Sequence, residues 1–203
     1  MNIGVIGFQG DVQEHLNMLK KISRKNREVK TVDVRRIADL QKVDALIIPG
    51  GESTTIYKLI TEYGLYDAIK QRASDGMPVM ATCAGLIIIS KETNDERVKG
   101  MGLIDVTVKR NAYGRQVMSF ETDVDIKGIG RFPAVFIRAP VIEDPGRSEV
   151  MAALDGTPVM VRQGNILAMT FHPELTGDAR IHEYFISMAW GRGGYISTAD
   201  VKR

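Results

Sequence analysis

Cys83 is the residue whose type and setting best suit a nucleophile. It is the only cysteine among 203 residues, and it stands between a short apolar segment and Ala84-Gly85-Leu86. A residue on a tight turn from strand to helix presents its side chain above the sheet edge, and the positive end of the following helix stabilises a thiolate. Cys83 is therefore a candidate nucleophile, with an inert buried thiol as the alternative.

His172 and Glu174, in the segment His172-Pro173-Glu174, supply a base and a carboxylate. Residues two apart in an extended segment project to the same side, so Glu174 is expected to reach the imidazole ring. A carboxylate on one ring nitrogen fixes the tautomer and leaves the other nitrogen to take a proton from a thiol. The alternative is a loop that carries only a surface ion pair.

The segment Pro49-Gly50-Gly51-Glu52-Ser53-Thr54 could supply an oxyanion hole. Adjacent glycines let backbone amides point into a cleft, where they stabilise the negative oxygen of a tetrahedral intermediate. Ser53 or Thr54 is expected to cap the helix that follows. The alternative is a tight turn with a helix cap and no role in chemistry.

Parallel strands must position these three segments. Short apolar runs alternate with helical spacing in the first half of the chain, and Asp11-x-x-Glu14 resembles a capping box at the start of the first helix. Cys83 and the two glycines follow the carboxyl ends of expected strands, which is where open α/β sheets bind ligands. The strands are expected at residues 3–8, 29–34, 44–48 and 78–82.

The second half of the chain changes to period-two alternation, as at residues 105–109 and 159–162. Gln163-Gly164-Asn165 is typical of a hairpin turn, and a closing helix is expected at about 177–190. We expect an α/β three-layer sandwich, flavodoxin-like, with a mostly parallel central sheet, helices on both faces and a mixed or antiparallel extension of the same sheet. Residues 1–190 form one domain in this interpretation, and 191–203 form a flexible tail.

Composition narrows the possible functions. Lys and Arg number 27 against 25 Asp and Glu, a formal net charge of +2, so no general field favours nucleic acid or a membrane. One cysteine and three histidines argue against a disulfide framework and against a metal centre. We expect no cofactor and a cytoplasmic location. His15 is expected at the surface or in an interface, and His182 lacks a metal-ligand partner.

Six segments in this order and spacing resemble the class I, or triad, glutamine amidotransferases. More narrowly, they resemble the family of glutaminase subunits of pyridoxal 5'-phosphate synthase. The resemblance covers residues 1 to about 190. It rests on Gly7-Phe8-Gln9-Gly10, Gly50-Gly51-Glu52-Ser53-Thr54-Thr55, Thr82-Cys83-Ala84-Gly85-Leu86-Ile87, the stretch 110–116 with 119–121, Phe136-Ile137-Arg138-Ala139-Pro140, and Phe171-His172-Pro173-Glu174-Leu175.

The resemblance implies roles for these residues. Cys83 would be the nucleophile, His172 the general base and acid, and Glu174 the residue that orients His172. The backbone amides at Gly51 and Ala84 would hold the oxyanion. The glutamine site would comprise Gly51, Glu52, Ser53, Arg110, Ile137 and Arg138, and Gln9 and Gly10 would lie at the interface with an activating partner. The two arginines suit the carboxylate of a free amino acid.

The implied activity is hydrolysis of L-glutamine, with the ammonia channelled to a PdxS-like synthase subunit that makes pyridoxal 5'-phosphate. One departure is Ala81, where the family has glycine, which adds a methyl group close to the nucleophile turn. Three alternatives remain open: a glutaminase that serves another synthase, a related α/β hydrolase or glyoxalase-like enzyme, and a non-catalytic regulatory subunit of this fold.

Overall fold

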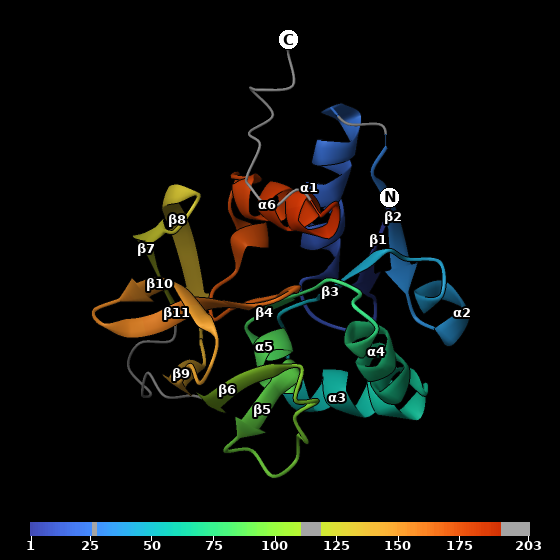
Figure 1. Cartoon of the computed structure of the whole chain (residues 1–203), viewed down its shortest axis with the longest axis horizontal. Coiled ribbons are helices and arrows are strands. Elements are labelled where there is room, and N and C mark those ends of the chain that lie inside the picture. The colour runs from blue at the N-terminus through green and yellow to red at the C-terminus, as the bar shows by residue number, and fades with distance from the viewer. Residues whose placement is uncertain (26–27, 111–118, 192–203) are drawn as a thin grey trace.

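A mostly parallel seven-stranded sheet forms the centre of the protein (Figure 1). The computed structural model describes residues 1–25, 28–110 and 119–191. The sheet order is β10-β11-β12-β4-β3-β1-β2. Parallel pairing joins β12 (Ile166–Met169), β4 (Val79–Thr82), β3 (Ala45–Ile48), β1 (Asn2–Ile6) and β2 (Lys30–Val34). β11 (Thr157–Gln163) pairs antiparallel with both β12 and β10 (Glu149–Leu154). The four strands predicted in the first half are confirmed.

Helices cover both faces of this sheet (Figure 1). Buried side chains form two clusters that alternate along the strands: Ile47 of β3 packs with the cluster under α1 and α6, whereas Leu46 and Ile48 pack with the cluster under α3, α4 and α5. Strands covered on both faces are apolar throughout, which explains the unbroken apolar run of β3. The helices are α1 (Val12–Lys25), α2 (Ile37–Leu40), α3 (Ser53–Glu62), α4 (Leu65–Ser74), α5 (Ala84–Ile89) and α6 (Arg180–Ala189).

The extension in the second half is divided among three sheets. β10 and β11 continue the central sheet, as expected for residues 159–162. The expectation that residues 105–109 join the same sheet is wrong: β6 (Ile104–Lys109) pairs with β5 (Ser90–Thr93) and β9 (Val141–Asp144) in a separate sheet. β7 (Ser119–Ile126) and β8 (Gly130–Ile137) form a two-stranded hairpin. Alternation shows that one face of a strand is buried, but not which strand lies beside it.

Two predicted connections can be compared with the structure. Gln163 pairs with Ile166 across a two-residue turn in which Gly164 has φ +56°, which confirms the hairpin. The closing helix is present but begins at Arg180, and a short 3-10 helix, η1 (Pro173–Leu175), precedes it. The predicted tail beyond Gly191 lies outside the described residues.

No helix in the described ranges has both the length and the apolar character needed to cross a membrane.

Candidate active site

The candidate site lies where four neighbouring parallel strands end. β12, β4, β3 and β1 are adjacent and parallel, so the loops that follow them meet at one edge of the sheet. These loops carry His172, Cys83, Gly51 and Asp11 in turn. The amide of Cys83 donates to the carbonyl of Met169 at 2.9 Å, which ties the nucleophile turn to the strand that leads to His172.

Cys83 occupies the tight turn that the sequence predicts. Its backbone has φ 45° and ψ −100°, a sparsely populated region for a residue other than glycine, and it is the N-cap residue of α5. The turn is possible because Gly85 lacks a side chain: a Cβ there would lie 2.2 Å from the carbonyl oxygen of Ile48. Ala81 is fully buried within β4 and the turn still forms, so its extra methyl group does not prevent this geometry.

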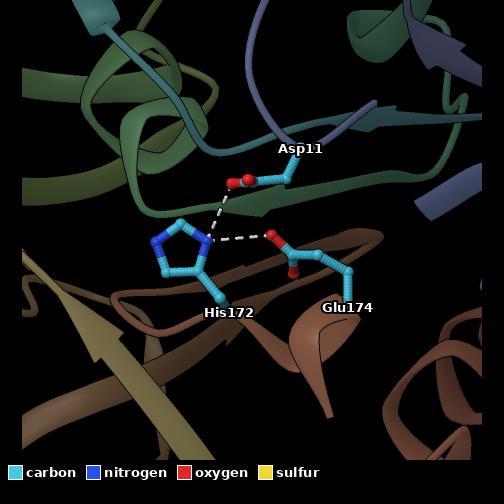
Figure 2. A group of neighbouring side chains, drawn as sticks. All are labelled: Asp11, His172 and Glu174. Atoms are coloured by element: carbon cyan, nitrogen blue, oxygen red, sulfur yellow. Dashed lines mark hydrogen bonds and ion pairs between the residues drawn. The ribbon is translucent and has the colours of Figure 1, made fainter. Parts of the chain in front are cut away.

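The imidazole of His172 contacts two carboxylates through one nitrogen (Figure 2). Its Nδ1 lies 2.9 Å from Oε1 of Glu174 and 3.1 Å from Oδ2 of Asp11. Its other nitrogen, Nε2, is buried and makes no hydrogen bond within the described ranges. The predicted contact between His172 and Glu174 is confirmed, although Glu174 reaches the ring from η1 and not from an extended segment.

Asp11 lies at the candidate site, although its spacing to Glu14 predicts a capping box at the start of α1. Instead of capping α1, its carboxylate is directed at His172, and its side chain makes no hydrogen bond to the α1 backbone in the part of the chain described. Its own amide donates to the carbonyl of Gly50 at 3.2 Å. Its position just after β1, at the carboxyl edge of a parallel sheet, is the signal that could have identified it.

These contacts favour a positively charged His172. Burial opposes the charge, but hydrogen bonding to Asp11 and Glu174, together with the electrostatic attraction of Cys83, outweighs burial and raises the pKa of His172. Burial also raises the pKa of Glu174, and the contact with His172 opposes that rise. Protonated His172 is therefore the form that this site stabilises, and such a ring can neutralise a thiolate at Cys83.

The loops after β1 and β3 are tied together by the residues predicted for the partner interface. The side-chain oxygen of Gln9 accepts from the amide of Glu52 at 2.8 Å. Gly10 has φ +92°, and a Cβ on it would lie 1.7 Å from the carbonyl oxygen of Gly50. Gly51 has φ +144° and packs against Gln9 and Gly10 in the same way. A movement of one of these loops therefore moves the other.

The predicted helix cap after these glycines is wrong. Glu52 is the N-cap residue of α3, and the helix has no side-chain hydrogen bond at this cap. The hydroxyl of Thr54 donates to Glu52, whereas the hydroxyl of Ser53 is buried and has no hydrogen-bond partner within the described ranges. Ser53 therefore has an unused polar group close to the loop of Gly50 and Gly51.

Arg110 lies beside Glu52, and both were predicted to bind glutamine. Its guanidinium donates to the carboxylates of Glu52 and Asp95, and its amide donates to Asn94 at 2.8 Å. Together with Arg97, it holds the pKa of Asp95 well below the usual range. This cluster lines a pocket of about 400 Å³ whose walls are formed by Asn94, Asp95, Glu96, Arg97 and Arg110. Asp95 was not singled out in the sequence.

Ile137 is the last residue of β8 and lies close to the nucleophile, and Arg138 follows it. Sγ of Cys83 lies 3.8 Å from the carbonyl oxygen of Ile137, within hydrogen-bonding reach of a thiol. Arg138 is exposed and has φ 42°, a backbone that residues other than glycine rarely adopt. Its side chain makes no ion pair or hydrogen bond to any other residue that the structure describes, so it is available to an anion.

Residues 111–116, part of one motif in the sequence, lie outside the described residues.

His15 is fully buried, which contradicts its expected place at the surface or in an interface. It lies on the inner side of α1 with Met18, Leu19 and Ile22, so the helical spacing that includes His15 belongs to the core. His182 of α6 is also fully buried.

Asp11, His172 and Glu174 bring atoms of metal-ligand type within 4.8 Å of one another. Both carboxylates, however, face the same ring nitrogen, an arrangement that suits an N–H of His172 as their shared donor. We assign no metal to this cluster, and the absence of a metal centre stays a prediction.

Comparison with known proteins identifies the family. The model of the SNO glutamine amidotransferase family matches residues 5–190. The chain belongs to this family. Two curated relatives of the SNO family are each described as pyridoxal 5'-phosphate synthase subunit PdxT. One, from Thermoplasma acidophilum, is 75% identical over 203 residues, all of both chains. The other, from Thermoplasma volcanium, is 70% identical over 199 residues, or 98% of this chain and 99% of that one.

Solved structures agree with the SNO assignment. A crystal structure described as a glutamine amidotransferase matches with a TM-score of 0.86 and 45% identity, covering 93% of this chain and 98% of the other. PurLQS from Thermotoga maritima matches with a TM-score of 0.63 at 15% identity, covering 94% and 95% of the two chains. The second match supports the fold alone, and the expected amidotransferase-like α/β architecture is confirmed.

Proposed function

We propose that this chain hydrolyses the side-chain amide of L-glutamine to L-glutamate and ammonia, with Cys83 as the nucleophile. The arrangement of His172 supports this most: Glu174 holds Nδ1 at 2.9 Å, and the buried Nε2 has no hydrogen bond among the described residues. An imidazole held at one nitrogen and open at the other is suited to move protons between a thiol and a leaving group. The electrostatic contact between Cys83 and His172 agrees with this pairing.

In the first half of the reaction, the Cys83 thiolate attacks the amide carbon of glutamine. The carbonyl π electrons move to oxygen, and the backbone amides of Gly51 and Ala84 hold the resulting oxyanion. Ala84 is the first residue of α5, so its N–H has no acceptor within the helix. His172 gives its proton to the nitrogen as the carbon–nitrogen bond breaks, and ammonia leaves a γ-glutamyl thioester on Cys83.

In the second half, water replaces the thiolate. His172, now neutral, takes a proton from the water as its oxygen attacks the thioester carbon. The carbon–sulfur bond breaks, glutamate leaves, and the thiolate and protonated His172 are restored. Glu174 keeps the ring in one orientation throughout, because its carboxylate stays on Nδ1.

The residues proposed for glutamine binding match the charges of a free amino acid. A zwitterion offers a carboxylate to arginine and an ammonium group to a carboxylate. Glu52 and Arg110 lie side by side and supply both complements, and Arg138 adds a second guanidinium near the end of β8. Ser53 and the backbone at Ile137 complete the set: the buried hydroxyl of Ser53 has no hydrogen-bond partner among the described residues, and the carbonyl oxygen of Ile137 lies 3.8 Å from Sγ of Cys83.

We also propose that a PdxS-like subunit receives the ammonia for the synthesis of pyridoxal 5'-phosphate. The support is the name carried by relatives at 75% and 70% identity. Gln9 and Gly10 lie in the loop that holds the Gly50-Gly51 segment, so a partner that binds this loop would act directly on the proposed oxyanion hole. We expect glutaminase activity to be weak alone and to rise with the synthase.

The test is glutamate formation from glutamine by wild-type and Cys83→Ala proteins, each mixed with the synthase subunit. We expect the wild type to be active and the variant to lose activity by several orders of magnitude, because no thioester can form. Gel filtration of the mixture shows whether the variant still binds its partner. Glutamate release by a partner-bound Cys83→Ala protein at the wild-type rate contradicts the nucleophile assignment.

A further inference from the structure

Two buried histidines that the reaction does not use lie behind the triad. His15 comes from α1 and His182 from α6, and each is fully buried. Nδ1 of His15 lies 3.0 Å from Nε2 of His182, which is a hydrogen bond. Burying two imidazoles in a protein core costs free energy unless their polar atoms have hydrogen-bond partners. The groups around the two rings therefore indicate whether they have a functional role.

The second nitrogen of His15 lies close to both Glu174 and Thr82. Its Nε2 lies 3.4 Å from Oε2 of Glu174 and 3.3 Å from the hydroxyl oxygen of Thr82. Oε1 of Glu174 already binds His172, whereas Oε2 has no hydrogen bond of regular geometry in the described part of the chain. The two oxygens of this buried carboxylate therefore face two different imidazoles.

The hydrogen-bond pattern selects one tautomer for His15. A neutral imidazole has one N–H and one lone pair. If Nδ1 accepts from the Nε2–H of His182, the proton of His15 is on Nε2, the nitrogen that lies 3.4 Å from Oε2 of Glu174 and 3.3 Å from the hydroxyl of Thr82. The opposite tautomer would place a nitrogen lone pair against carboxylate lone pairs. Only the first tautomer supplies a donor to the second oxygen of Glu174.

Both histidines are neutral in this environment. Burial lowers the pKa of His15, and the nearby His182 and His172 lower it further. Burial alone lowers the pKa of His182 to about 3. The groups that face Glu174 are His172 and Asp11 from the catalytic side and His15 from α1. The pair therefore does not exchange protons at neutral pH, but it can still donate a hydrogen bond.

We propose that His15 is a positioning residue for the reaction: its Nε2–H holds the second oxygen of Glu174, and His182 fixes the tautomer that makes this possible. The two contacts prevent the carboxylate from rotating away from His172, and they stabilise its negative charge inside the core. This inference rests on the proposed function, since it assigns a role relative to the triad of Cys83, His172 and Glu174.

The test compares His15→Leu with His15→Gln in the complex with the synthase subunit. Glutamine keeps an N–H near the position of Nε2, whereas leucine fills a similar space without a donor. We expect His15→Leu to lower kcat for glutamine hydrolysis roughly tenfold to a hundredfold with little change in KM, since one hydrogen bond to a charged group is lost. His15→Gln should recover most of this loss. Met18→Leu, on the same buried side of α1, is the matched control and should keep wild-type kinetics.

The pH profile distinguishes positioning from packing. A donor to Glu174 stabilises its charged form, so loss of the donor raises the pKa of that carboxyl group further. The acid limb of kcat/KM should therefore move to higher pH in His15→Leu and stay in place in His15→Gln. A packing role predicts a lower melting temperature in both variants with an unmoved acid limb, and that result would overturn the proposal.

A spectroscopic measurement covers the case in which the leucine variant does not fold. Nitrogen-15 NMR of wild-type protein with labelled histidine reports the tautomer of each ring. We expect His15 and His182 to be neutral Nε2–H tautomers from pH 6 to 8, and an Nδ1–H or protonated His15 contradicts the proposal. If Cys83→Ala is inactive while His15→Leu behaves as wild type, only this inference fails. If Cys83→Ala is as active as the wild type, the proposed function fails.

Discussion

At the scale of single residues, the imidazole of His172 contacts two carboxylates, whereas a catalytic triad needs one. Glu174 and Asp11 both lie within 3.1 Å of Nδ1. The protonated ring gains from both contacts, because each carboxylate favours the charged form. Glu174 is buried, whereas the side chain of Asp11 is 28% exposed at the rim of the site. Asp11 therefore adjusts the charge of His172 from a position that solvent or a partner can reach.

Asp11→Asn tests this effect. The variant removes a negative charge from Nδ1, so the pKa of His172 falls from its raised value. The proposed reaction needs protonated His172 to release ammonia, and activity is therefore lost as pH rises through that pKa. We expect the basic limb of kcat/KM for glutamine hydrolysis by the complex to move to lower pH. Glu14→Gln also removes a negative charge, three residues later in the first turn of α1, and should leave the basic limb of kcat/KM in place.

Some residues of the site are predictable from type and spacing, and others are not. Cys83, His172 and Glu174 carry local signals: a strand-to-helix turn and a pair of residues two apart. His15 carries no such signal, and the one signal of Asp11 is its position after β1. Their contacts with Glu174 and His172 bring together segments more than 150 residues apart in the chain. In the sequence, Asp11 is equally typical of a helix cap, and the position of His15 is equally typical of the exposed side of a helix.

At the scale of elements, the nucleophile turn depends on the close packing of β3 against α5. The carbonyl of Ile48 occupies the space that a side chain on Gly85 would need. This contact sets how near α5 approaches the sheet and therefore where Cys83 stands. The separate sheet of β5, β6 and β9 lies beyond α5 (Figure 1). Arg110 directly follows β6 and reaches Glu52 at the start of α3.

Gly85→Ala is expected to destabilise the protein even though alanine favours helices. The new Cβ would meet a backbone carbonyl at 2.2 Å, so α5 or β3 must shift. We expect the free energy of unfolding in urea to fall by about 1–3 kcal/mol. Gly177→Ala meets nothing within 4 Å and should change it by less than about 0.5 kcal/mol. Equal stability of the two variants would show that this contact does not limit the turn.

The elements themselves were predictable to different degrees. β1, β3 and β4 are predictable from apolar runs followed by glycine or cysteine motifs, because strands buried on both faces leave that pattern. The partners of β6 were not, since alternation at 105–109 is the same whichever strand pairs with it. Neither was η1, in which Pro173 sits at the first position of a single turn.

At the scale of the whole molecule, the proposed catalytic residues lie at one edge of the central sheet, and the hydrophobic core covers both of its faces. Each face is covered by its own cluster of buried apolar side chains. The proposed reaction centre therefore lies at the edge where β12, β4, β3 and β1 end, beside the loop of Gln9 and Gly10. A partner bound to that loop would sit over the place where ammonia forms.

This arrangement predicts direct transfer of ammonia. Ammonia released into water is protonated and ceases to be a nucleophile, so a synthase subunit seated over the edge would receive it unprotonated. In the assembled complex, glutamine labelled with nitrogen-15 in its side-chain amide should place its label in pyridoxal 5'-phosphate even when unlabelled ammonium is in large excess. Mass spectrometry of the product measures the labelled fraction. The complex containing Cys83→Ala is the control, because it can use only the added ammonium and should give unlabelled product. Dilution of the label to the level of the ammonium pool in the wild-type complex would mean that ammonia escapes to solvent before it is used.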